Sequence, residues 1–245
     1  MFATNAAVGT GAFDRVFTVN YLSHFLLTEK LMPLLRKAER PPVIVQTSSL
    51  FHWAVDGTDL IQLEGRALPL AAQPGGSRGF YIFRTQRSYA NSKLAQIYHA
   101  RSLKLHNPTA RIVSYCPGWV ATNIAGTDDS LATTFLARVA FPVAEWGIAS
   151  ALHAIFGSDG DESSDFFINS KAYRMGECIF PKATPAWMYQ SGIRDLVVFV
   201  YALIGLWTQN LVPHAEPIRS SPESYNLTRA TALYEWSQNA VAEYL

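Results

Sequence analysis

Tyr89 and Lys93 are the two residues whose types and spacing most clearly suggest chemistry. They lie four residues apart in a segment predicted to be helical, so both side chains would project from one face. A phenol with a pKa of about 10 is a poor acid–base catalyst at neutral pH, and a nearby ammonium lowers that pKa by favouring the phenolate. Such a pair could exchange a proton with an alcohol or carbonyl oxygen. The spacing alone is weak evidence, because it also arises by chance on exposed helices.

Other polar residues follow in an order that would bring them to this pair. Asn20 lies in a predicted helix, Ser49 ends a predicted strand, and the segment Pro117–Thr122 ends another. The carboxyl ends of parallel strands meet at one edge of a sheet, where such folds bind ligands. We therefore expect these residues to face one crevice.

The elements that must position these residues alternate between helices and strands. Apolar residues recur at a helical period in the predicted helices, whereas Val43–Thr47 is the short apolar run of a strand covered on both faces. This alternation predicts an α/β fold with a parallel sheet. The predicted helices are 13–37, 88–106 with Ser88 as its cap, about 131–157 and 226–245; the predicted strands are 43–47, 111–115 and 165–169. A long loop is expected over 51–87 and an insertion over 176–225.

Composition limits the classes of function. The 245 residues are 49% hydrophobic and 16% charged, which indicates one globular domain spanning 1–245. A net charge of +1 without a basic stripe argues against nucleic acid as a partner. Cys116 and Cys178 form no CxxC pair and have no histidine cluster beside them, so neither a disulfide framework nor a metal site is indicated.

Two segments of the sequence indicate where the protein is located in the cell and whether it associates with a surface. The N-terminus has neither the positive region nor the apolar core of a secretory signal, so we expect a cytoplasmic protein. The apolar run within 196–212 is too short to span a bilayer. It predicts either a buried helix or a helix that associates with a membrane surface or a partner.

Four short motifs, in this order, resemble the successive signatures of the short-chain dehydrogenase/reductase family, within a span from about residue 3 to 125. They are Val19-Asn20, Thr47-Ser48-Ser49, Tyr89-x-x-x-Lys93 and Pro117-Gly118-x-Val120-x-Thr122. The residues around them, including His24, His52 and Ser92, are similar to the retinol-dehydrogenase-like branch, which includes the WW-domain-containing oxidoreductase. The resemblance implies a Rossmann-like doubly wound parallel sheet and an NAD(P)-dependent oxidoreductase that interconverts an alcohol and a carbonyl.

The resemblance also implies a role for each catalytic-type residue. Tyr89 would donate or accept the proton, and Lys93 would lower its pKa and bind the nicotinamide ribose. Ser49 would hydrogen-bond the substrate oxygen and is preferred over Ser48, while Asn20 would support a water relay behind the lysine. His24 and His52 are interpreted as packing or loop residues.

Cofactor and substrate follow from the same resemblance. Asn5 lies in a sequence similar to the family's Asn-Ala-Gly, and the segment of Pro117, Gly118, Val120 and Thr122 would hold the nicotinamide carboxamide. NADP is expected from the branch, with NAD as the alternative. An apolar alcohol or carbonyl would suit a pocket lined by aromatic residues beyond the Pro-Gly motif, although core packing explains them equally well: Trp119, Phe135, Phe141 and Trp146.

The sequence departs from the family at its start. No glycine-rich turn follows a strand, and the GxG at residues 9–11 lacks the third glycine and is interpreted as a turn. We expect a domain without the N-terminal strands of the fold. Two explanations stay open: an incomplete piece of a normal enzyme, or a truncated inactive chain that acts by protein–protein interaction. A homodimer through helices 13–37 and 88–106 would fit either.

Overall fold

The computed structural model describes residues 13–61, 84–118, 144–157, 166–168, 185–209 and 216–245. Several sequence predictions fall outside these ranges. They concern Asn5, Val120 and Thr122, the GxG turn, and the pocket residues Trp119, Phe135 and Phe141. The side chain of Trp146 is likewise not described.

The described strands form one sheet in the order β1-β2-β3-β4. The first three strands are parallel, with Val45 opposite Val113 and Ser114 opposite Phe166, and the fourth pairs antiparallel with β3. Their bounds are Val43–Thr47 for β1, Arg111–Cys116 for β2, Phe166–Ile168 for β3 and Glu216–Ile218 for β4. The three predicted strands are confirmed, and β4 lies in the segment predicted as an insertion.

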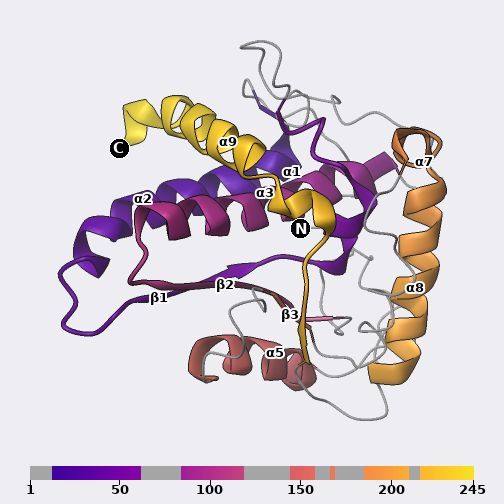
Figure 1. The fold of residues 1–245 in the computed structure, drawn as a ribbon, viewed down its shortest axis with the longest axis horizontal. Coiled ribbons are helices and arrows are strands. Elements are labelled where there is room, and N and C mark those ends of the chain that lie inside the picture. The colour runs from indigo at the N-terminus through magenta and orange to yellow at the C-terminus, as the bar shows by residue number, and fades with distance from the viewer. Residues whose placement is uncertain (1–12, 62–83, 119–143, 158–165, 169–184, 210–215) are drawn as a thin grey trace, which may run out of the picture.

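Helices cover both faces of the sheet (Figure 1). Helix α3 (Arg84–His106) packs on β1 and β2, with α9 (Leu227–Ala240) against its other side. Helix α5 (Ala144–Phe156) packs on the opposite face of the sheet. The chain therefore has a mixed α/β fold that is mostly helical. Because α3 lies between the sheet and α9, its side chains are buried along most of its length.

The first predicted helix is confirmed, with one irregular turn. Helix α1 (Arg15–Phe17) continues through a π-helical turn at Thr18–Leu22 into α2 (Ser23–Leu35). Its N-cap is Asp14, whose Oδ1 accepts hydrogen bonds from the Phe17 backbone N–H at 2.9 Å and from the Ser88 hydroxyl at 2.8 Å. The prediction that Ser88 caps the next helix is wrong, since α3 begins at Arg84 and the Ser88 hydroxyl is engaged by Asp14.

An aromatic cluster joins α2, α3 and α9 behind the sheet. The fully buried His99 ring lies 4.7 Å from the Phe25 ring and 6.2 Å from the ring of Tyr234. Tyr234 donates to a carboxylate oxygen of Glu29 at 2.9 Å, and Tyr21 shares a 2.8 Å hydrogen bond with Ser237. These contacts fix the C-terminal helix against the two helices that carry the candidate site.

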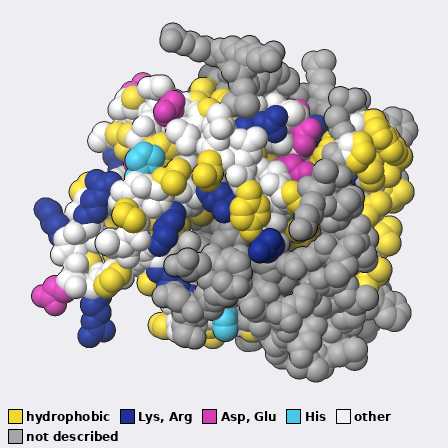
Figure 2. Space-filling model, viewed as in Figure 1, with side chains coloured by type: hydrophobic (Ala, Val, Ile, Leu, Met, Phe, Trp, Pro, Cys, Tyr) yellow, Lys and Arg dark blue, Asp and Glu magenta, His cyan; other side chains and the backbone are white. Residues whose placement is uncertain are grey.

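The predicted apolar helix is confirmed as α8 (Ile193–Gln209), which follows the short α7 (Ala186–Gln190). Its inner side buries Val198 and Tyr201 and packs on the 3₁₀-helix Leu50–Ala54. Among its described side chains, the outer side exposes Ile193, Leu196, Val200, Leu203 and Ile204. Figure 2 shows hydrophobic side chains gathered along the edge where α8 lies. Among the described residues, no helix is long and apolar enough to cross a membrane.

Candidate functional site

Three of the four predicted catalytic residues meet at the carboxyl end of β1. Ser49 begins the turn after this strand, and its side chain lies close enough to Tyr89 to oppose the rise in the pKa of the phenol. The ammonium nitrogen of Lys93 lies 5.4 Å from the centre of the Tyr89 ring. All three residues are buried, with exposed fractions of 8% for Ser49, 7% for Tyr89 and 9% for Lys93. The spacing of Tyr89 and Lys93 on one helix face thus brings both next to the strand end.

Lys93 is anchored to the strand rather than to the phenol oxygen. Its Nζ donates a hydrogen bond to the backbone carbonyl of Thr47 at 3.0 Å. Burial lowers the pKa of Lys93 to about 8, because a charged ammonium is disfavoured away from water. A lysine with a pKa this close to neutrality can take part in proton exchange near pH 8.

Burial raises the pKa of the Tyr89 phenol above its usual value, and the nearby Ser49 side chain opposes this rise. The direction is opposite to the one expected from the Lys93 cation, because removal of the phenol from water outweighs the favourable interactions. The rings of Phe51 and Tyr89 pack edge to face with their centroids 6.3 Å apart, and Phe51 thereby helps to exclude water from the phenol. Tyr89 is therefore a neutral hydrogen-bond donor at pH 7.

The two neighbouring serines have different contacts. The Ser48 hydroxyl donates to the backbone carbonyl of Lys93 at 2.8 Å and so ties β1 to α3. The Ser49 oxygen accepts from the Phe51 backbone N–H at 3.4 Å and lies on the side of Tyr89, where it acts on the pKa of the phenol. This placement favours Ser49 as the serine of the site.

Asn20 lies in the π-helical turn, a local widening of the helix that is frequent at functional sites. Its side-chain amide donates to the Ser92 hydroxyl at 3.2 Å, and that hydroxyl donates to the backbone carbonyl of Tyr89 at 2.7 Å. The Gln96 amide donates to the backbone carbonyl of Asn20. Asn20 is thus linked to Tyr89 through two hydrogen bonds that pass through Ser92, and Gln96 is a contact that the sequence did not single out.

Cys116 joins the loops after β1 and β2. Its sulfur accepts hydrogen bonds from the backbone N–H groups of Leu50 and Gly118, each at 3.4 Å. Burial raises the pKa of the Cys116 thiol, so the sulfur stays neutral. Gly118 has a φ of 74°, a left-handed conformation that favours glycine, and follows the half-buried Pro117. Sequence reasoning missed Cys116 in the site, although its position immediately before Pro117 at a predicted strand end was an available signal.

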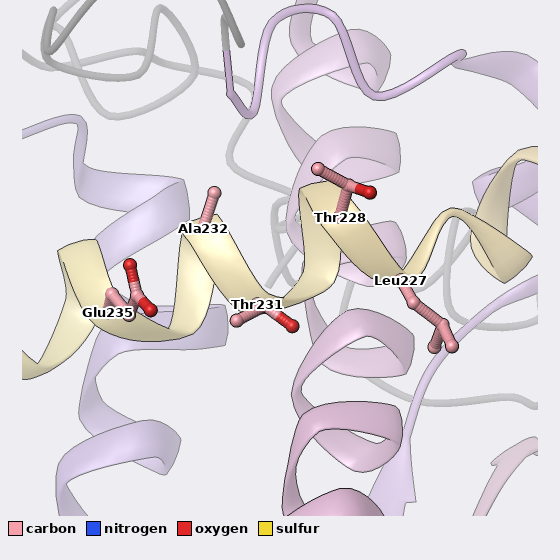
Figure 3. A pocket seen from close by; sticks show the side chains of 5 residues that line it. All are labelled: Leu227, Thr228, Thr231, Ala232 and Glu235. Carbon is pink, nitrogen blue, oxygen red and sulfur yellow. The ribbon is translucent and has the colours of Figure 1, made fainter.

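The pocket in Figure 3 lies along one face of α9, and none of the predicted site residues lines it. Its lining residues are Leu227, Thr228, Thr231, Ala232 and Glu235. Among the described residues, no group of three histidine, cysteine or acidic side chains could hold a metal ion.

No protein-family model matches this sequence, and no curated protein sequence matches it either. The site is therefore interpreted from its own geometry and from the motifs in the sequence.

Proposed function

We propose that the chain is an NAD(P)-dependent oxidoreductase of the short-chain dehydrogenase/reductase type, or the catalytic part of one. The observation that carries this proposal is the contact of Ser49, Tyr89 and Lys93 at the carboxyl end of a parallel strand. The parallel strands β1, β2 and β3, with α3 and α5 on opposite faces, support a Rossmann-like doubly wound sheet. The reaction would interconvert an apolar alcohol and the corresponding carbonyl compound.

Tyr89 would serve as the acid in the reductive direction. The raised pKa keeps the phenol protonated at pH 7 but makes it a weaker acid, so proton transfer would depend on the lowering of this pKa by Lys93 that the resemblance implies. The Ser49 hydroxyl, which lies near the phenol, would hydrogen-bond the same substrate oxygen. The nicotinamide cofactor would supply or accept the hydride.

The residues near Tyr89 fit the nicotinamide end of such a cofactor. An ammonium carries three N–H donors, and the hydrogen bond from Lys93 to Thr47 uses one of them. Another could reach a ribose hydroxyl. Gly118 adds no side chain at the strand end beside this group. Contacts from Asn5, Val120 and Thr122 and the preference for NADP over NAD remain proposals from the resemblance.

Association through a surface is the second candidate function. Helix α2 exposes a stripe of leucines at Leu27, Leu31 and Leu34, spaced to share one helix face. Such a stripe suits a second copy of the chain, and the exposed face of α8 within 196–212 suits a membrane surface or a partner. This function would not require Tyr89.

Titration of the purified chain with NADPH and NADH tests the proposal, followed by reduction of a panel of apolar aldehydes and ketones. Tyr89→Phe keeps the aromatic ring and removes the hydroxyl that would transfer the proton. We expect micromolar NADPH binding in both proteins and a loss of turnover of about 10² to 10⁴-fold in the variant. Tyr21→Phe is the matched control, because it also removes a buried tyrosine hydroxyl but lies in the aromatic core.

Two results would count against the proposal. Turnover that is unchanged in Tyr89→Phe would remove this residue from the mechanism. Absence of binding of either nucleotide up to millimolar concentration would contradict the enzymatic function and leave the interaction function as the better candidate, to be measured by light scattering.

A further inference from the structure

His52 is fully buried three residues after Ser49, with both ring nitrogens in hydrogen bonds. Nδ1 lies 2.6 Å from the backbone carbonyl oxygen of Ser49, and Nε2 lies 2.9 Å from the backbone nitrogen of Ser221. A backbone N–H can only donate, so Nε2 accepts. A neutral imidazole then carries its proton on Nδ1 and donates to Ser49.

The surroundings keep this ring neutral. Burial lowers the pKa of His52 to about 3, and the charges of Arg101 and Arg194 act in the same direction, while the Ser49 carbonyl opposes them. Protonation would place a second N–H against the N–H of Ser221. The hydrogen-bonded chain from Ser221 through His52 to Ser49 is therefore intact throughout the neutral pH range.

The far end of this chain is a well-fixed segment, Ser220–Ser224. The hydroxyls of Ser220 and Ser224 are 2.7 Å apart, and Ser224 donates to the backbone carbonyl of Ser221 at 2.6 Å. Arg101 of α3 donates to the Ser220 hydroxyl at 2.9 Å. The His52 imidazole thus contacts a residue 169 positions away in the sequence.

We infer that His52 is a positioning residue that holds the backbone of Ser49 against the segment Ser220–Ser224, and so fixes the position of the Ser49 hydroxyl beside Tyr89. The inference rests on the proposed function for its catalytic meaning. The predicted role of His52 as a packing or loop residue is thereby extended to orientation of a site residue. Orientation matters because displacement of a reacting group by about 1 Å can cost about 10²-fold in rate.

Ser221 provides a matched pair of variants that leaves His52 itself unchanged. Ser221→Pro deletes the N–H that donates to His52, and the Ser221 φ of −55° is one that proline adopts. Ser221→Ala removes the same hydroxyl but keeps the N–H. Only the proline variant should therefore release the histidine ring.

The measurement is the ¹³Cζ resonance of Tyr89 in chain labelled at tyrosine Cζ, assigned by its absence in Tyr89→Phe. This resonance reports the hydrogen bonding of the phenol and requires no ligand. We expect it to shift in Ser221→Pro and in His52→Phe, and to stay in place in Ser221→Ala. His52→Asn, which retains a donor toward Ser49, should restore the original position.

The outcomes separate the inference from the proposed function. An unshifted Tyr89 resonance in folded Ser221→Pro and His52→Phe would overturn the positioning role, whatever the activity. If the Tyr89 resonance shifts in these variants but the unaltered chain binds neither NADPH nor NADH, the positioning role of His52 is supported and only the proposed oxidoreductase activity is contradicted. If both variants fail to fold by circular dichroism, a ¹⁵N-histidine spectrum of the unaltered chain decides: a His52 ring protonated on Nε2 overturns the inference, and one protonated on Nδ1 supports it.

Discussion

Replacing Lys93 by methionine should make the protein slightly more resistant to unfolding at neutral pH, and this advantage should fall and then reverse as the pH rises. The Lys93 pKa falls from 10.5 to about 8 in the folded protein, which corresponds to about 3 kcal/mol of unfavourable charge burial. Lys93 is only 9% exposed, so solvent screens little of this cost. Methionine fills a similar volume without charge, although it gives up the hydrogen bond to Thr47, worth roughly 1.5–3 kcal/mol.

The pH dependence is the sharper part of this prediction. Below pH 8 the lysine is protonated in both the folded and the unfolded protein, so the cost of burial is fully present. Between about pH 8 and 10.5 the unfolded chain binds more protons, and the stability of the unaltered protein rises with pH. The stability of Lys93→Met relative to the unaltered chain should therefore fall by about 2.5 kcal/mol between pH 7 and pH 10.

Urea unfolding of both proteins at several pH values from 7 to 10 measures this difference. Titration of the tyrosines occurs in both proteins, whereas Cys116 interacts electrostatically with Lys93, so Cys116→Ala is introduced into both proteins to remove its contribution. Lys104→Met, at an exposed lysine of the same helix, controls for the loss of a surface charge. A difference in stability that stays constant from pH 7 to 10 would refute the reasoning, because it would mean that Lys93 is solvated in the folded state.

Three further substitutions have separate expected outcomes. Gly57→Ala should destabilise the protein by at least about 2 kcal/mol, because φ is 80° and an added Cβ would lie 2.5 Å from the Tyr98 hydroxyl; a midpoint of urea unfolding equal to that of the unaltered chain would contradict this. Ser48→Ala should lower the free energy of unfolding by about 1 kcal/mol, because it removes the hydrogen bond from Ser48 to the Lys93 backbone carbonyl, while NADPH binding is retained. Thermal unfolding and nucleotide titration measure the two effects. Asn226→Ala should lower stability by about 1 kcal/mol, because its side chain caps α9; an unchanged melting temperature would argue against the cap.

Most helices and strands of this fold could be predicted from the sequence because they depend on local hydrophobic patterns. The helical period over 13–37 and the apolar run at Val43–Thr47 both correspond to observed elements. Boundaries set by distant contacts were not readable: Ser88 has the residue type of a cap, yet its hydroxyl binds Asp14, 74 residues away. Strand β4 was missed because Glu216-Pro217-Ile218 has no strand pattern, and proline is tolerated only at such an edge.

The part of the candidate site that depends on helical spacing and on the ends of strands could be predicted from the sequence. Tyr89, Lys93 and Ser49 meet as the motif order predicts. The sequence could not reveal that the lysine would bind the Thr47 carbonyl or that burial would raise the phenol pKa. Nor could it reveal the partner of His52, because that contact depends on how the C-terminal segment packs.

The antiparallel pairing of β4 with β3 has a consequence for the order in which the protein can form during synthesis. Residues 169–215 separate the two strands, so the outer edge of β3 has no β4 partner until residue 218 has left the ribosome. An unpaired strand edge is a template for pairing with another chain. The nascent protein therefore passes through an interval of exposure to misassembly, which ends only when this last strand arrives.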